Sequence, residues 1–368
     1  MTTMDENKNK IYYEDLHYIF ENIGESEKGK FKDSTILITG CAGFLGYYFM
    51  SFLSAYAERL KIKKVIGIDN FLLGIPNWMN ALVDKNPKIE IYSFDITKFS
   101  QFESAKIKDA TFIIHMASIA SPSFYRKYPL ETVDANVIGL RALLDFYKRK
   151  EIKGFLFFSS SEVYGDPSSD QIPTKEEYRG NVAMIGPRAC YDEAKRFGET
   201  LCYLYAETYQ MPISIVRPFN NYGPGMKLDD KRVPADFAKA IIENTSLIIH
   251  SDGSPTRTFC YVTDAIVGYL KALVYEPFDY FNIGIEEPEI SIKELAHIYL
   301  EAGSTIFNFN RSIEFKTSQE PVYLVDNPSR RCPDIAKAKK ILNYSPQIIV
   351  EQGVYRFLSY LKQGRDKH

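Results

Sequence analysis

Short apolar runs rich in β-branched and aromatic residues alternate along the first 217 residues with longer segments of helical period. This alternation is typical of a parallel sheet with helices on both faces. The runs predict strands at 35–39, 65–68, 89–92, 111–115, 155–158 and 213–216. We therefore expect an α/β fold in which residues 34–217 form a Rossmann-like, doubly wound parallel sheet.

After residue 217 the alternation gives way to loops that contain Pro and Gly. We expect residues 218–368 to form mainly a smaller α/β substrate-binding lobe, with some segments returning to the Rossmann domain. Such a lobe closes over the carboxyl ends of the strands, where ligands bind in these folds. Its expected elements are short strands at 247–249 and 280–283 and helices near 291–302 and 334–342.

Residues 1–33 precede the first predicted strand and form an N-terminal extension. Two alternatives stay open for it. Residues 11–20 have the spacing of a short amphipathic helix, whereas the flanking Lys, Asn and Glu favour a poorly ordered segment.

Composition narrows the classes of function. With 45% hydrophobic and 25% charged residues and a net charge of -2, the chain resembles an ordinary globular enzyme with no general attraction for nucleic acid or anionic membranes. The five cysteines are odd in number and lack metal-ligand spacing, which favours reduced thiols and no metal site. No apolar stretch of about 18 residues and no signal peptide are present, so we expect a cytoplasmic protein without a membrane partner.

A glycine-rich turn follows the first predicted strand and precedes a helical segment. Gly40, Gly43 and Gly46 have the spacing that allows a tight turn and places a pyrophosphate at a helix N-terminus, although the spacing alone is also compatible with a simple turn. Asp69 ends the second strand, where a carboxylate binds ribose hydroxyls and repels a 2′-phosphate, so NAD is favoured over NADP. Asp95, after the third strand, either contacts the adenine or is a solvated acid.

Tyr191 and Lys195 are four residues apart and share one face of a predicted helix. A phenol has a pKa of about 10, but a nearby ammonium and a nicotinamide cation stabilise the phenolate. We therefore expect a tyrosine base of lowered pKa. The strand that ends at Ser159 is followed by Ser160 and Ser161, whose hydroxyls can hydrogen-bond a substrate and the phenol. This combination predicts hydride transfer to and from a sugar hydroxyl.

Taken together, these motifs resemble the extended short-chain dehydrogenase/reductase superfamily of nucleotide-sugar epimerases, dehydratases and decarboxylases. Residues 180–195, 120–125, 232–233 and 331–334 are similar to the UDP-glucuronate decarboxylase (UDP-xylose synthase) family, and the similarity spans about residues 34–362. The resemblance implies an NAD cofactor, a UDP-glucuronic acid substrate and a homodimer joined by a four-helix bundle. In that bundle we expect a buried face built from Leu140, Leu143, Leu144 and Tyr147.

The reaction implied by this resemblance begins when NAD takes hydride from C4 of the hexuronic acid and Tyr191 takes the hydroxyl proton. The C6 carboxylate is then β to a ketone and leaves as CO2, after which protonation at C5 and return of hydride give UDP-xylose, unless the 4-keto pentose is released. The resemblance places Glu162 and Arg331 near C5 and C6 as acid/base and charge partners. It gives Ser160 or Ser161 the relay of the tyrosine proton.

The resemblance assigns three sets of residues. Catalysis is assigned to Tyr191, Lys195, Glu162, Ser160, Ser161 and Arg331. Cofactor binding is assigned to Gly40, Gly43, Phe44, Leu45, Gly46, Asp69, Asn70, Asp95, Ile96, Ala117, Tyr191 and Lys195. Binding of the nucleotide sugar is assigned to Tyr125, Asn220, Arg232, Val233, His250, Arg257 and Arg331.

Alternative activities and several departures from the family pattern stay open. A 4,6-dehydratase would carry Asp where this chain has Ser161, a 4-epimerase would need neither Glu162 nor Arg331, and a catalytically silent NAD-binding scaffold would show no turnover. The departures are Cys41 and Tyr47 in the cofactor turn, and Lys231, His250 and Ser251 near the expected base pocket. Cys190, next to the tyrosine, is expected to pack rather than to react.

Overall fold

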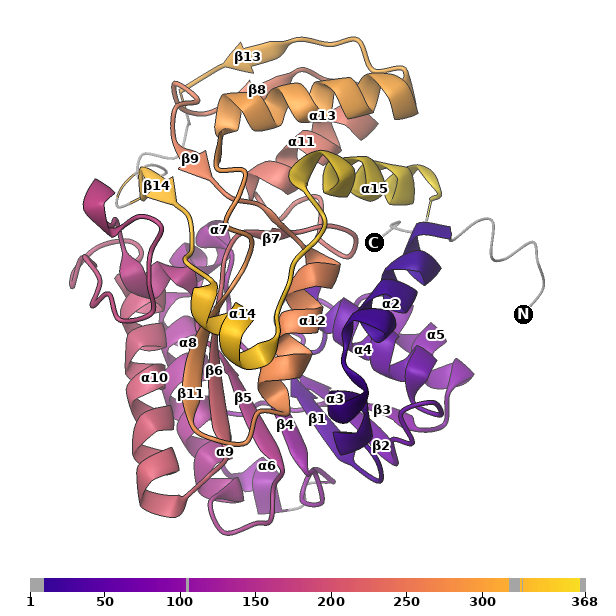
Figure 1. Cartoon of the computed structure of the whole chain (residues 1–368), viewed down its shortest axis with the longest axis vertical. Helices are drawn as coiled ribbons and strands as arrows, with labels where there is room; N and C mark the ends of the chain where they lie inside the picture. The colour runs from indigo at the N-terminus through magenta and orange to yellow at the C-terminus, as the bar shows by residue number, and fades with distance from the viewer. Residues whose placement is uncertain (1–9, 104–105, 318–324, 326, 365–368) are drawn as a thin grey trace.

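A wholly parallel sheet of seven strands, in the order β11-β6-β5-β4-β1-β2-β3, forms the centre of the molecule (Figure 1). The computed structural model describes residues 10–103, 106–317, 325 and 327–364. The strands are β1 (Thr35–Thr39), β2 (Lys64–Asp69), β3 (Ile89–Ser93), β4 (Phe112–His115), β5 (Gly154–Phe158), β6 (Ile213–Pro218) and β11 (Asp279–Ile283). The six strands expected before residue 217 and the Rossmann-like fold are confirmed.

One strand lies elsewhere than expected. The sequence placed residues 280–283 in the smaller lobe, but β11 pairs in parallel with β6 and forms an edge of the large sheet. Its central residue Phe281 is fully buried, so an apolar run distant in sequence completes the sheet. The domain division at residue 217 stays a prediction.

Helices cover both faces of the sheet, which explains why its inner strands are apolar on both sides. One face packs against α4 (Phe44–Tyr56) and α12 (Val262–Leu273). The other packs against α9 (Leu140–Tyr147) and α10 (Ala189–Tyr209). The other helices between β1 and β6 are α5 (Trp78–Lys85), α6 (Ser100–Glu103), α7 (Pro122–Lys127), α8 (Pro129–Val133), η1 (Asp134–Gly139), η2 (Ser161–Tyr164) and η3 (Ser169–Gln171).

The residues of helix α9 that were expected at a dimer interface are buried within the chain. Its apolar stripe, which is fully buried against the sheet of its own chain, consists of Leu140, Leu143, Leu144 and Tyr147. These side chains are therefore core residues, and their assignment to a face between subunits was wrong. Exposed apolar side chains of the neighbouring helices include Leu130 and Ile138 on α8 and η1, and Phe197 and Leu204 on α10.

The smaller lobe lies beyond the carboxyl ends of the strands, at the top of Figure 1. Its α13 begins with a capping box between Ser291 and Glu294 and runs further than the expected 291–302. The lobe contains α11 (Val233–Ile242), α13 (Ile292–Phe307), β8 (Leu247–Ile249), β13 (Ile313–Phe315), β9 (Thr256–Arg257), β12 (Ile290–Ser291) and β14 (Arg330–Arg331). The other elements of this half are β7 (Asn221–Tyr222), β10 (Cys260–Tyr261), α14 (Ala336–Leu342) and α15 (Val350–Lys362).

The N-terminal extension forms helix α2 (Lys10–Asn22), followed by α3 (Glu25–Lys30). Helix α2 packs against α4, α12 and α15, so the helical alternative is the one that the fold adopts for this segment (Figure 1). Its Asp15 is fully buried and its carboxylate accepts hydrogen bonds from three other segments of the chain. Residues 1–9 lie outside the described residues.

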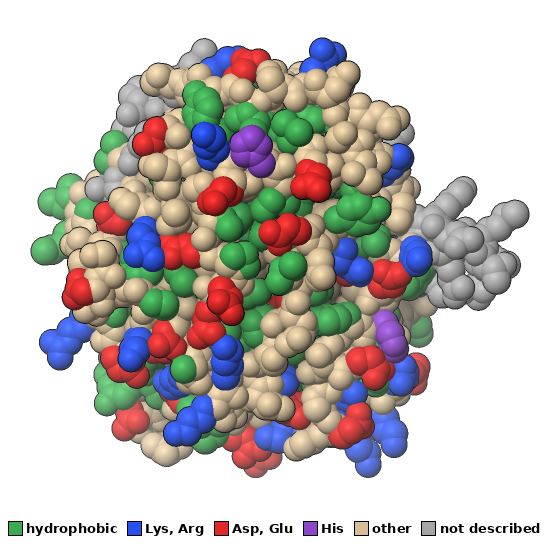
Figure 2. Space-filling model, turned by 45° about the horizontal axis from the view of Figure 1, so that its top comes forward, with side chains coloured by type: hydrophobic (Ala, Val, Ile, Leu, Met, Phe, Trp, Pro, Cys, Tyr) green, Lys and Arg blue, Asp and Glu red, His purple; other side chains and the backbone are tan. Residues whose placement is uncertain are grey.

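The surface agrees with the small net charge. On the face shown in Figure 2, basic and acidic side chains are interspersed and neither forms a continuous stripe. None of the described helices has both the length and the apolar character needed to cross a bilayer.

Candidate active site

A cavity of about 570 Å³ lies between the carboxyl ends of the strands and the smaller lobe. Every residue assigned to catalysis, cofactor binding or substrate binding from the sequence lines this one cavity. Their convergence is a result of the parallel topology, because all the parallel strands end at the same edge of the sheet. Their individual roles stay predictions.

The glycine-rich turn at one end of the cavity fits a dinucleotide. Gly40 has φ +71°, and a Cβ there would lie 2.8 Å from backbone atoms of Ala117, while a Cβ on Gly46 would lie 2.3 Å from the carbonyl oxygen of Cys41. Gly43 is the N-cap of α4 and lines the cavity. The free N–H groups of the first helical turn therefore face the place where a pyrophosphate would bind.

The carboxylate of Asp69 ends β2 beside this turn. It accepts backbone N–H groups from Ala42 at 3.1 Å and from Phe71 at 2.8 Å, although burial raises the pKa of Asp69. Its position fits the adenosine ribose. Asp95 accepts hydrogen bonds from the backbone and the hydroxyl of Thr97, so part of its acceptor capacity is used within its own turn.

The two departures in the cofactor turn are packing residues. The sulfur of Cys41 faces Gly67 on β2, where a Cβ would come within 2.9 Å of it. Tyr47 is buried, shares a hydrogen bond of 2.7 Å with the hydroxyl of Tyr360 on α15, and meets Trp78 edge-on. Neither residue lines the cavity, although Tyr47 packs against Trp78, which does.

Tyr191 and Lys195 lie on the first two turns of α10 and line the cavity. Burial raises the pKa of Tyr191 to about 12, against a hydrogen bond with Ser160 that lowers it. Lys195 donates to the carbonyl oxygen of Phe158 at 2.6 Å, and burial lowers its pKa to about 7. In the protein without a cofactor, the desolvation of the phenol outweighs the nearby polar groups. The expected lowering of the tyrosine pKa depends also on the positive nicotinamide ring, so it stays a prediction.

Glu162, in the short helix η2 after β5, is held between two arginines. Arg188 donates to one carboxylate oxygen and Arg331 to the other. Burial opposes ionisation, but the charges and hydrogen bonds of the two guanidinium groups lower the pKa of Glu162 to about 2. The carboxylate is therefore ionised at neutral pH and has no proton to donate.

The adjacent arginines of β14 have different partners. Arg331 is buried and points into the cavity, where it also donates to the hydroxyl of Ser161 at 3.2 Å. Arg330 instead forms a two-pronged pair with Glu289, with N to O distances of 2.6 and 2.9 Å. The sequence motif thus assigned the correct arginine to the cavity.

Arg188 and Asp192 were missed from the sequence. Arg188 is buried, lines the cavity and lies 3.5 Å from Asp192 across one turn of α10. Burial and the charge of Glu162 raise the pKa of Asp192 to about 7. A usable signal was present, because Arg188 precedes Tyr191 by three residues and therefore lies on the same side of the chain as the predicted base.

The residues expected to hold the diphosphate have protein partners of their own. Arg257 donates to the carbonyl oxygens of Thr256, Pro328 and Ser329, and burial lowers its pKa to about 9. This arginine fixes the loop before β14 as well as lining the cavity.

Arg232 and Asn220 also lie at the wall of the cavity. The guanidinium of Arg232 forms two hydrogen bonds with Asp230, and the Asn220 amide donates to the carbonyl oxygen of Thr258 at 2.9 Å. Val233 and His250 line the part of the cavity expected to hold the base. Phosphate binding by these residues stays a prediction.

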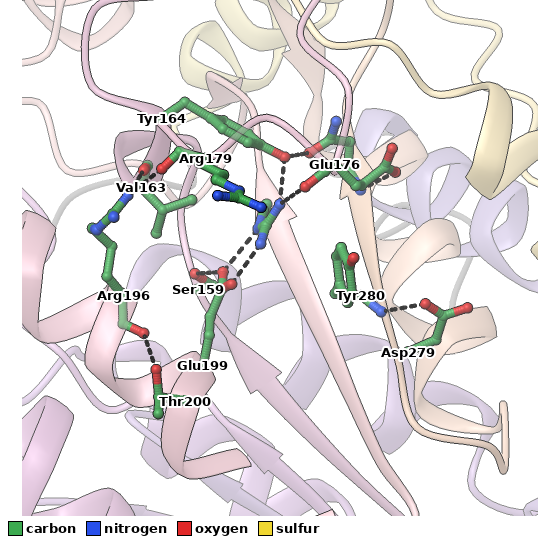
Figure 3. A network of polar contacts seen from close by, with 12 residues as sticks. Ser159, Val163, Tyr164, Glu176, Arg179, Arg196, Glu199, Thr200, Asp279 and Tyr280 are labelled. Carbon is green, nitrogen blue, oxygen red and sulfur yellow. Dashed lines mark hydrogen bonds and ion pairs between the residues drawn. The ribbon is translucent and has the colours of Figure 1, made fainter. Parts of the chain in front are cut away.

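A buried network holds the end of β5 from behind (Figure 3). The hydroxyl of Ser159 donates to Glu199 at 2.5 Å, and Arg217 donates twice to the same carboxylate and once to the hydroxyl of Tyr164. The network ties β5, β6 and α10 together. It therefore fixes the backbone that presents residues 160–162 to the cavity.

The chain is similar to nucleotide-sugar enzymes. A sequence model of the NAD dependent epimerase/dehydratase family matches residues 36–284. UDP-glucuronic acid decarboxylase 1 of Arabidopsis thaliana is 36% identical over 88% of this chain and 69% of its own length, and its namesake in Xenopus tropicalis is 32% identical over 89% and 72%. The structure of UDP-glucuronic acid 4-epimerase from Bacillus cereus with UDP-glucuronic acid and NAD has TM-score 0.71 and 26% identity, covering 89% of this chain and 99% of that one.

Metal binding has no support within the part of the chain that the structure describes. It contains no group of three or more His, Cys, Asp or Glu side chains placed to hold a metal ion.

Proposed function

Because the chain belongs to the NAD dependent epimerase/dehydratase family, we propose that this NAD-dependent enzyme converts UDP-glucuronic acid by decarboxylation into UDP-xylose or the corresponding 4-keto pentose. The observation that carries the proposal is the ionised Glu162 held between Arg188 and Arg331 in the cavity that Tyr191 lines. Such a cluster matches a sugar that carries a negative charge at C6. The curated relatives named above support the same activity.

The first step removes a proton and a hydride from C4 of the sugar. Bound NAD supplies the hydride acceptor, and its positive ring favours the ionised phenol. Tyr191 accepts the hydroxyl proton, with Ser160 in hydrogen-bond contact with the phenol. Lys195, anchored on the carbonyl oxygen of Phe158, holds its amine near the tyrosine ring.

The second step breaks the bond between C5 and C6. Once C4 is a ketone, the electrons of that bond pass to the C4 oxygen as CO2 leaves, and C5 then gains a proton. Glu162 is ionised before this step and holds no proton for C5, so the proton that C5 gains comes from solvent and Glu162 orients that water. Arg331 holds Glu162 in place and offers positive charge beside the enolate.

The same residues argue against dehydration. A dehydratase needs a general acid at the position of Ser161, whose hydroxyl is a poor acid and accepts a hydrogen bond from Arg331. The B. cereus neighbour acts on UDP-glucuronic acid as a 4-epimerase, so epimerisation is the alternative product that the experiment has to distinguish.

Proton NMR of the anomeric signals tests the proposal. Purified protein is incubated with UDP-glucuronic acid and NAD, with Tyr191→Phe as the matched inactive control. We expect UDP-xylose or its 4-keto precursor with the wild type and no turnover with the variant. UDP-galacturonic acid as the product would replace the decarboxylase by the epimerase, and an unchanged substrate would contradict both.

We also propose a homodimer formed through the exposed apolar side chains Leu130, Ile138, Phe197 and Leu204. Helices α8 and η1 pack beside α10, so two copies of this surface would form a bundle of four helices. Light scattering on Phe197→Glu should show a monomer. The control Phe315→Glu changes an equally exposed apolar residue in the smaller lobe and should leave the mass unchanged.

A cytoplasmic location completes the proposal. All five cysteines are free, and four of them are buried, as expected for a protein kept in a reducing compartment.

A further inference from the structure

Arg188 and Arg331 share Glu162, but they differ in how much hydrogen-bonding capacity remains. Arg331 donates to Glu162, to the hydroxyl of Ser161 and to the carbonyl oxygen of Gly165, the last two at 3.2 Å. Within the described residues, Arg188 donates a hydrogen bond to Glu162 and forms an ion pair with Asp192, whose carboxylate lies 3.5 Å from its Nε. A guanidinium has five N–H donors, so Arg188 is the arginine with donors left for a ligand.

Three buried polar atoms around Arg188 have no hydrogen-bond partner among the described residues. They are the hydroxyl of Tyr125, Nε of Arg188, which faces Asp192 at 3.5 Å, and one carboxylate oxygen of Asp192. Each of these side chains is at least nine-tenths buried, and Tyr125 and Arg188 line the cavity. The ring of Tyr125 is stacked on Tyr191, with 5.2 Å between centroids, so the unmatched hydroxyl of Tyr125 belongs to the same wall of the cavity as the predicted base.

The charges of the cluster do not cancel. Two guanidinium groups face one ionised Glu162, which leaves one positive charge before Asp192 is counted. Burial and the negative charge of Glu162 keep Asp192 protonated up to a pKa of about 7. A buried site with surplus positive charge and free N–H and O–H donors matches a second carboxylate.

We propose that Arg188, assisted by the hydroxyl of Tyr125, binds the C6 carboxylate of the substrate, and that Arg331 serves to hold Glu162. Asp192 is a positioning residue that orients Arg188 from behind, since it lies against the guanidinium but does not line the cavity. The inference rests on the proposed function, because it assumes a hexuronic acid as the substrate. It assigns to Arg188 a recognition role that separates the acid from the neutral sugar.

Calorimetric titration of the NAD-loaded protein with UDP-glucuronic acid and with UDP-glucose tests the assignment. The wild type should prefer the acid, and Arg188→Gln should lose about 10- to 100-fold of its affinity for the acid. Its affinity for UDP-glucose should change by about threefold or less, which also shows that the variant is folded. Arg330→Gln, which alters the exposed neighbour paired with Glu289, should keep the wild-type ratio.

Several outcomes would overturn the assignment. An equal loss for both ligands would make Arg188 structural, and a wild type that binds both ligands equally would remove carboxylate recognition altogether. A shift of the ratio in Arg331→Gln but not in Arg188→Gln would transfer the role to Arg331. If Arg188→Gln does not fold, Arg188→Lys is the variant to measure, because it keeps the charge but loses the planar guanidinium. Its ratio of affinities for UDP-glucuronic acid and UDP-glucose should lie between the wild-type ratio and one.

The pH dependence of binding tests Asp192. The charged or titratable groups around it are Glu162 on η2, Arg188, Cys190 and Tyr191 at the start of α10, Arg331 on β14 and Tyr125 on α7. As the pH rises through about 7, Asp192 ionises and affinity for the acid should fall in the wild type but not in Asp192→Asn. UDP-glucose controls for titration of Lys195. An identical pH profile for both proteins would contradict the positioning role.

Failure of this inference and failure of the proposed function are distinguishable. A wild type that prefers UDP-glucuronic acid but releases UDP-galacturonic acid would end the decarboxylase proposal and leave carboxylate recognition by Arg188 intact. A decarboxylase in which Arg188→Gln leaves the ratio of affinities unchanged would do the reverse.

Discussion

Two buried clusters in this protein pair a carboxylate with arginine. They differ in how many of their polar groups lack a hydrogen-bond partner. Around Asp15, the carboxylate accepts from Tyr48, Tyr261 and Arg356 at 2.6 to 3.0 Å and is fully buried away from the active-site cavity. Around Glu162, two arginines share one carboxylate and several donors remain unmatched at the wall of a cavity. The Asp15 cluster therefore stabilises the fold by itself, and we call it the closed cluster. The Glu162 cluster has donors available to a ligand, and we call it the open cluster.

The two carboxyl groups also shift in opposite directions. Burial raises the pKa of Asp15, because a single guanidinium and two hydroxyls do not offset its desolvation. At Glu162 the same penalty is exceeded by two guanidinium groups, and the pKa falls to about 2. For these two acids, the second guanidinium group beside Glu162 accounts for the opposite sign of the pKa shift.

The largest expected effect breaks the open cluster. Glu162→Gln keeps the shape of the side chain but removes the negative charge that orients water for protonation at C5, so turnover of UDP-glucuronic acid should fall about 10²- to 10⁴-fold. Initial rates by NMR measure the loss, and NAD binding by fluorescence should be unchanged. Full activity in this variant would show that the ionised carboxylate takes no part in the reaction.

The next effect breaks the closed cluster. Asp15→Ala leaves Arg356 without its main partner and should lower the free energy of unfolding by about 3 to 5 kcal/mol. Turnover per folded molecule should stay near that of the wild type. Denaturant titration and the NMR assay measure the two quantities, and a selective loss of turnover would connect helix α2 with catalysis.

The contributions of Glu162 and Asp15 to the free energy of unfolding should depend on pH in opposite directions. The pKa of Glu162 is lower in the folded protein than its ordinary 4.5, so its contribution to stability is present above 4.5 and is lost as the pH falls towards 2. The pKa of Asp15 is raised above 3.8, so its contribution is present below 3.8 and is lost as the pH rises through the folded value. The stability differences from Glu162→Gln and from Asp15→Asn, measured by denaturant titration across acid pH, should therefore change with opposite signs.

The smallest effect concerns the outer partner of Arg356. Glu14 lies 3.1 Å from the guanidinium, but its side chain is 40% exposed, so solvent screens the pair. Glu14→Gln should lower the free energy of unfolding by about 1 kcal/mol or less. Thermal unfolding beside Asp15→Ala measures the difference, and equal losses would mean that burial does not separate the two pairs.

Much of the fold followed from local pattern. The apolar runs located the strands of the large sheet to within one or two residues, because parallel strands must be apolar on both faces. The glycine turn, Tyr191 and Lys195 were recognised because the spacing of residues within one turn or helix determines which of them lie on the same side. The family and its cofactor followed from the same motifs.

The sequence was a poorer guide where a residue's role depends on contacts with residues distant in the chain. Leu140 and its companions have the spacing of a buried helical face, but the period does not say whether the sheet or a second subunit covers it. The pKa of Tyr191 was expected to fall beside Lys195 and the nicotinamide cation, and in the protein without a cofactor burial raises it, so that expectation stays a prediction for the NAD-bound enzyme. Arg188 stood in the quoted motif and was passed over, because its contact with Glu162 joins residues 26 positions apart.

The sequence by itself determined the parallel sheet, the dinucleotide turn and the identity of the predicted base, since each depends on residues close together in the chain. Only the tertiary structure showed that β11 completes the large sheet and that Asp15 of helix α2 is hydrogen-bonded to Arg356. It also showed that Arg188 and Arg331 both donate to Glu162. These arrangements depend on long-range packing and on burial. Burial sets the strength and the sign of electrostatic interactions, and no local spacing encodes it.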